Sequence, residues 1–137
     1  TNEIKEKTES KNITNYNSKS LQGRLHKKKD IISWEMVKKM YLEPKFISPC
    51  HAAGLFGIIS ADGKVYPCEI LEDKLLGNLR DYQMDFMKIW SNKETQETKK
   101  WIKKSKCNCT YECALSYNIL GNLRYQPSLL SSMFNLS

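Results

Sequence analysis

The spacing of the cysteines constrains this chain more than any other feature of its sequence. Five cysteines stand among 137 residues, at positions 50, 68, 107, 109 and 113. A small secreted protein held by disulfides normally has an even number of cysteines and too few residues for a core of its own. The odd count, the length of the chain and the polar start Thr1–Lys5, which lacks the apolar run of a secretion signal, argue against disulfides.

Metal binding explains the cysteines better than burial as separate core thiols. Cys107, Cys109 and Cys113 stand among Lys, Asn, Thr and Glu, which is poor sequence for a hydrophobic core. No histidine lies in this group. A site whose ligands are all thiolates selects zinc or an iron–sulfur cluster.

The spacing of the thiols favours the cluster. Zinc sites usually take their ligands from two C-x₂₋₄-C knuckles, and only Cys109 and Cys113 have that spacing. Cys50 and Cys68 are joined instead by a predicted β-hairpin. Ligands spread so widely along the sequence suit the size of a four-iron cluster. The alternative is a zinc-binding structural or interaction module.

The first part of the chain predicts a linker and then a helix. Residues 1–29 are mostly polar and end in a basic run, which is typical of a solvated linker. Apolar residues then recur at steps of three and four, as on one face of a helix that ends before Pro44. These residues are Ile31, Trp34, Val37 and Tyr41.

The middle of the chain predicts a β-hairpin. Two runs rich in β-forming residues, 56–60 and 64–67, are separated by Asp62-Gly63. This pair predicts a hairpin, because a tight hairpin turn needs residues that tolerate positive φ. Pro67 should end the second strand, since it cannot donate to a sheet.

Helices should follow the hairpin. Ser91 and Glu94 have the spacing of a capping box, which predicts a helix that begins there and runs to Ile102. A short helix should run from Cys113 to a stop at Gly121. One helical face carries Tyr82, Phe86, Ile89 and Trp90. The aromatic residues expected in the core are Tyr66, Phe86, Trp90 and Trp101. We therefore predict an α+β fold, a small β-hairpin followed by helices around a cysteine-ligated cluster.

One set of segments resembles a known family. Cys50, Gly63 and Cys68 form the pattern C-x₁₂-G-x₄-C, and the segments Gly77–Arg80, Asp85–Trp90 and Lys106–Cys113 follow it. In this order they resemble the SPASM or "twitch" auxiliary-cluster domain at the C-terminus of radical S-adenosylmethionine (radical SAM) enzymes. The chain has too few cysteines for the full SPASM pattern, which binds two clusters, so the twitch form is the better match.

The resemblance implies a metal site and its ligands. It implies a 4Fe-4S cluster with Cys50 and Cys68 as the first two ligands, and the other two from Cys107, Cys109 and Cys113. Cys113 ranks first of these three, because a helix N-terminus favours a thiolate. We expect one of Cys107 and Cys109 to be excluded, because a single residue separates them.

The resemblance also implies a domain organisation. Residues 1–29 would be the linker from an absent radical SAM core, 30–48 a connecting helix, 49–125 the cluster domain and 126–137 a C-terminal tail. The C-x₃-C-x₂-C motif of the radical-generating site is not found, since Ser116 takes the third place after Cys109 and Cys113. We expect the fragment not to be catalytic alone; the parent enzyme would hold S-adenosylmethionine and a second 4Fe-4S cluster in the N-terminal barrel.

The implied role is electron transfer or substrate positioning for a radical reaction on a peptide, sugar or small metabolite. The net charge of +7 and the basic stretches 24–29 and 99–106 raise the alternative of nucleic-acid binding. We do not expect it, because a Lys-rich helix face is far more often a solvated surface. No apolar run is long enough to span a membrane, and we expect a cytoplasmic location.

Overall fold

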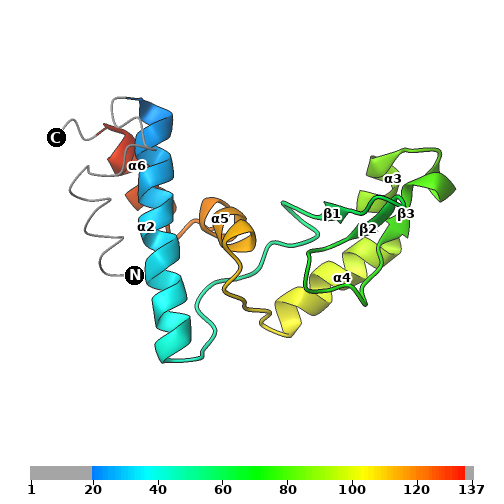
Figure 1. The fold of residues 1–137 in the computed structure, drawn as a ribbon, viewed down its shortest axis with the longest axis horizontal. Helices are drawn as coiled ribbons and strands as arrows, with labels where there is room; N and C mark the ends of the chain where they lie inside the picture. Colours follow the sequence, from blue (N-terminus) through cyan, green and yellow to red (C-terminus); the bar gives the residue numbers. More distant parts are fainter. Residues whose placement is uncertain (1–19, 135–137) are drawn as a thin grey trace. The chain divides into compact units, whose positions relative to one another are not determined.

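The structure is a computed structural model that describes residues 20–134 (Figure 1). Most of the predicted linker, residues 1–19, lies outside the described residues. Two compact units make up the fold. One runs from Pro49 to Cys109, and the other is formed by the residues that precede and follow it.

A small antiparallel sheet forms the centre of the first unit. It contains β1 (Ile58–Ile59), β2 (Lys64–Tyr66) and β3 (Gly77–Asn78), in the order β1-β2-β3. Ile59 pairs with Val65 in the first ladder, and Val65 pairs with Gly77 in the second. The predicted hairpin is confirmed. The sequence did not predict β3, because its two residues show no alternation of apolar and polar side chains.

The hairpin turn uses glycine as expected, but at one position only. The Gly63 amide donates to the Ser60 carbonyl over 2.9 Å, and Gly63 has φ of 87° while Asp62 is not among the residues with positive φ. Asp62 instead accepts a hydrogen bond from the Ser60 hydroxyl. Pro67 follows the last residue of β2, as predicted.

Three helical segments follow the sheet in this unit. They are the 3₁₀ helix η1 (Leu79–Tyr82), α3 (Phe86–Trp90) and α4 (Lys93–Lys104). The predicted capping box is wrong: the N-cap of α4 is Asn92, whose side chain accepts from the Thr95 amide over 2.7 Å. Ser91 ends α3, and its hydroxyl donates to the Met87 carbonyl.

The core of this unit joins the sheet to the helices. Val65 and Ile89 are fully buried, and Ile102 of α4 is 2% exposed. The rings of Phe86 and Trp90 stack at 5.0 Å between centroids against this core. Its buried members are Ala52, Ala53, Val65, Leu76, Leu79, Ile89 and Ile102.

The second unit is helical. It contains α2 (Leu21–Leu42), α5 (Glu112–Leu120) and α6 (Gln126–Phe134). The helix predicted from residue 30 begins at Leu21, because Ser20 caps it by accepting from the Gly23 amide over 3.0 Å, so residues 21–29 are helical. The expected helix up to Gly121 is α5, and part of the predicted tail is α6.

The buried face of α2 is not the predicted stripe. Tyr41 is 84% exposed, whereas Ile32, Met36 and Met40 are buried against residues of α5 and α6. Their spacing of four residues gives a stripe beside the predicted one, and unbranched Met side chains fill it. The partners are Leu115, Ile119 and Leu129.

These elements make an α+β fold, as predicted: a small antiparallel sheet is followed by helices. None of the helices described between residues 20 and 134 combines the length and the apolar character needed to cross a membrane.

Candidate metal centre

Four of the five cysteines belong to the unit from Pro49 to Cys109. Cys50 begins it, Cys68 follows β2, and Cys107 and Cys109 follow α4. All four are partly buried. The thiols come from three segments that the fold of this unit must bring together.

A tight turn holds the segment after Cys50. The amides of Gly54 and Leu55 both donate to the His51 carbonyl, at 3.0 and 2.8 Å, and the Ala53 amide donates to the Phe56 carbonyl. Ala53 is fully buried and has φ of 59°, the left-handed conformation that an L-residue rarely adopts. The chain therefore reverses directly after Cys50, and the side chain of Cys50 packs against the core.

The hairpin positions Cys68. Val65 of β2 is fully buried, Pro67 is buried and ends the strand, and Cys68 packs against the same core as Cys50. Because β2 is the central strand, its end is fixed by ladders on both sides. Cys50 and Cys68, one before and one after the hairpin, thus pack against the same core.

The end of α4 positions Cys107. The amide of Cys107 donates to the Ile102 carbonyl over 3.2 Å, and the amide of Lys106 donates to the Lys103 carbonyl over 3.4 Å. These two bonds form a Schellman motif, with Lys106 at φ of 52° in the place that glycine usually takes. Ile102 and Cys107 meet in the same core, so the motif turns this thiol inward.

The Cys107 thiol lies at the centre of the cysteine group. It shares a hydrogen bond with the Cys50 thiol, and it is close enough to Cys68 and Cys109 to be affected by their charge. The bond to Cys50, burial and the negative charges of these three neighbours raise the pKa of Cys107 far above its ordinary value of 9.0. Cys113 does not contribute to this shift.

Cys113 belongs to the helical unit, where it is exposed in the first turn of α5. The structure therefore brings together four of the five predicted ligands within one unit. The assignment of all five cysteines as metal ligands stays a prediction.

The four grouped thiols fit an iron–sulfur cluster by their chemistry. They are soft donors, they are partly buried beside an apolar core, and their mutual closeness raises the cost of ionising them without a cation. Each thiolate of such a cluster binds a different iron, so the thiols need not converge on one point. Across residues 20–134, no three or more Cys, His, Asp or Glu side chains are arranged to hold a single metal ion.

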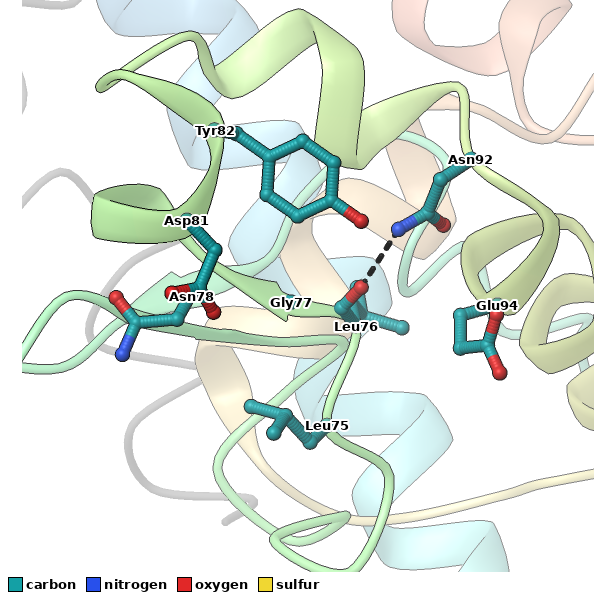
Figure 2. A pocket seen from close by; sticks show the side chains of 8 residues that line it. All are labelled: Leu75, Leu76, Gly77, Asn78, Asp81, Tyr82, Asn92 and Glu94. Atoms are coloured by element: carbon teal, nitrogen blue, oxygen red, sulfur yellow. Dashed lines mark hydrogen bonds between the residues drawn. The ribbon is translucent and has the colours of Figure 1, made fainter.

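A separate pocket lies beside β3 (Figure 2). Its volume is about 440 Å³, and no cysteine lines it. The Asn92 amide donates to the Leu76 carbonyl over 2.8 Å on its wall, and the Tyr82 ring lies beside it. Nothing in the sequence indicated this pocket, whose lining is joined only through the fold. The lining residues are Leu75, Leu76, Gly77, Asn78, Asp81, Tyr82, Asn92 and Glu94.

The comparison with protein families supports an iron–sulfur site at the grouped thiols. Residues 50–114 match the family model of SPASM, described as an iron-sulfur cluster-binding domain. The match begins at Cys50 and includes all five cysteines. The comparisons with curated proteins and with solved structures gave no match. Residues 50–114 are thus similar to SPASM iron–sulfur cluster-binding domains.

Proposed function

We propose that this chain carries the auxiliary 4Fe-4S cluster of a radical SAM enzyme. The observation that carries the proposal is the grouping of four thiols around Cys107 in a segment that matches the SPASM family model. The radical reaction itself would be catalysed by an N-terminal barrel that binds S-adenosylmethionine and a second 4Fe-4S cluster. The substrate of that reaction would be a peptide, a sugar or another small metabolite.

The arrangement of the thiols supports four of them as ligands. Cys50, Cys68 and Cys107 come from three different segments and pack against one core, which supports them as ligands. Cys109 is the fourth, because it lies in the same unit and its charge acts on Cys107. Cys113 is the spare thiol in this assignment, which reverses its rank from the sequence alone.

Complete thiolate ligation favours one role for the cluster. A cluster with a thiolate on each iron has no open iron for a substrate, and its chemistry is then the exchange of single electrons. The surrounding residues would set the reduction potential, through burial by the core and through nearby charges. We therefore favour electron transfer, with shaping of the substrate site as a second contribution.

Anaerobic reconstitution with iron and sulfide tests the proposal. We expect about four irons and about four sulfides per chain, with the brown charge-transfer absorbance of a cluster. Stoichiometric zinc without sulfide, retained in competition with iron and sulfide, would overturn it in favour of a zinc-binding structural module. A second sample of the chain is loaded with zinc alone, and its bound metal is measured by native mass spectrometry, which separates the two outcomes.

A further inference from the structure

Four lysines gather at the C-terminal end of α4. Lys100, Lys103, Lys104 and Lys106 are all exposed, and we name them the α4 lysine patch. Lys100, Lys103 and Lys104 lie three and four positions apart, so they share one side of the helix. Trp101, which is 42% exposed, lies beside them with the Lys74 ammonium 4.9 Å from its ring centroid.

The charges of this patch are not neutralised by the described residues. Within 20–134, none of the four lysines takes part in an ion pair. The acidic residues of α4 lie in its first half, where Glu97 pairs with Lys93 over 3.7 Å. The positive charge is therefore concentrated at one end of the helix.

The helix macrodipole explains only part of the patch. Cations in the last turn stabilise a helix, which accounts for Lys103 and Lys104. It does not account for Lys106, which lies beyond the helix in a left-handed conformation that glycine would adopt at lower cost. Lys106 thus carries a positive charge at a position where the backbone conformation would favour glycine.

The patch and the thiol group share one end of α4. Lys106 directly precedes Cys107, and its amide bonds back to the Lys103 carbonyl in the motif that positions this thiol. A protein that docks on the patch would contact Lys106, the residue directly before Cys107. Both thiols are partly buried.

We propose that the α4 lysine patch is the docking surface for an acidic one-electron carrier protein. This inference rests on the proposed cluster. In the exchange the carrier is oxidised by one electron and the cluster is reduced from its 2+ to its 1+ state, and no bond or proton is transferred. Opposite charges steer such an encounter and need only a small interface, so complex formation is fast, weak and sensitive to salt.

The test uses the full chain with its cluster reconstituted, and reduced plant-type ferredoxin as the acidic carrier. The variant Lys100→Gln/Lys103→Gln/Lys104→Gln removes three charges from the patch. Its matched control, Lys39→Gln/Lys88→Gln/Lys93→Gln, removes the same charge from other exposed positions. Iron and sulfide content and reduction by dithionite are measured first in every variant, so that loss of the cluster is distinguished from loss of docking.

Stopped-flow bleaching of the cluster gives the rate of electron transfer. At low salt we expect the patch variant to lose about tenfold or more in the second-order rate with ferredoxin, and the control to change by less than about twofold. Dithionite rates should be equal in all three proteins. Equal losses in both variants, or no loss in either, would overturn the inference.

Binding without electron transfer gives a second measurement. Carbodiimide cross-linking to oxidised ferredoxin should join patch lysines to ferredoxin carboxylates, and the yield should fall as salt rises to about 0.5 M. Cross-links confined to other lysines would overturn the inference. So would duplex DNA that binds the patch tightly enough to displace ferredoxin at equal concentration.

Discussion

The Cys107 thiol is hydrogen-bonded to the Cys50 thiol, although the sheet, η1, α3 and α4 separate them along the chain. This contact joins the start of the cysteine-rich unit to its end. Both residues pack on the core that also contains Ile102, so the folded unit holds the pair together. Binding of a cluster would therefore stabilise the whole unit, because the unfolded chain has no such site.

Single Cys→Ser variants should separate ligands from the spare thiol. We expect Cys50→Ser, Cys68→Ser and Cys107→Ser to lower cluster content to less than about a quarter of the wild-type level, because removal of a soft thiolate leaves an iron without its ligand. Cys113→Ser is the matched control and should retain the wild-type content. Iron and sulfide analysis after reconstitution gives the result, and a cluster that survives Cys109→Ser but not Cys113→Ser would reverse the assignment of the fourth ligand.

The N-cap of α4 can be tested with two neighbouring residues. Asn92→Ala should lower the free energy of unfolding by about 1–2 kcal/mol, because it removes the acceptor for the Thr95 amide and the donor to the Leu76 carbonyl. Ser91→Ala should cost less than about 0.5 kcal/mol, since it removes only a hydroxyl bond within α3. Urea unfolding followed by circular dichroism measures both, and a larger effect at Ser91 would restore the capping box that the sequence predicted.

The left-handed residue at the end of α4 offers a stabilising change. Lys106→Gly should raise the free energy of unfolding by up to about 1 kcal/mol relative to Lys106→Ala, because glycine adopts φ of 52° without the steric cost of a Cβ atom. The alanine variant is the control for loss of the charge. Thermal and urea unfolding of the cluster-free chain measure the difference, and an alanine variant more stable than the glycine variant would contradict the left-handed conformation.

The hairpin turn should weaken at low pH. The hydrogen bonds from Lys64 and from Ser60 hold the pKa of Asp62 well below its ordinary value of 3.8. A carboxyl with a lowered pKa in the folded state stabilises the fold above the unfolded pKa, and this contribution is lost as the pH falls. The wild-type chain should therefore exceed Asp62→Asn in stability by a constant amount above about pH 5, and by less as the pH falls through 3.8 and below.

Urea midpoints of the two proteins between pH 6 and pH 2 check this dependence. The effect should be small, because the Asp62 carboxylate is exposed to solvent. Glu97→Gln provides a control, since Glu97 lies on α4 and away from the hairpin. A difference between wild type and Asp62→Asn that grows on acidification would contradict the turn as described.

Local signals predicted the elements that depend on neighbours in sequence. Asp62-Gly63 between two β-rich runs indicated the hairpin, and Gly121 indicated the end of α5. The third strand could not be predicted in the same way, because Gly77 and Asn78 become a strand only by pairing with β2. The N-cap of α4 was misplaced because Ser91 and Asn92 both have capping side chains, and only the path of the chain out of α3 decides between them.

The faces of the helices were harder to predict than the helices themselves. Several apolar stripes fit α2, and its buried stripe through Met36 is fixed by the shape of α5 and α6 rather than by the pattern within α2. Trp101 shows the same limit, since this aromatic residue was expected in the core and is 42% exposed on α4.

The sequence by itself determined that this is a cysteine-rich α+β chain with a segment that matches the SPASM family model, because cysteine spacing and turn residues are properties of the chain alone. The tertiary structure decided which thiols meet. Cys50 and Cys107 lie far apart in sequence, and only the packing of α4 on the hairpin core and the Schellman turn at Lys106 bring them into contact. The same turn adds Lys106 to Lys100, Lys103 and Lys104 at that end of α4, and none of these four lysines has an ion-pair partner among residues 20–134.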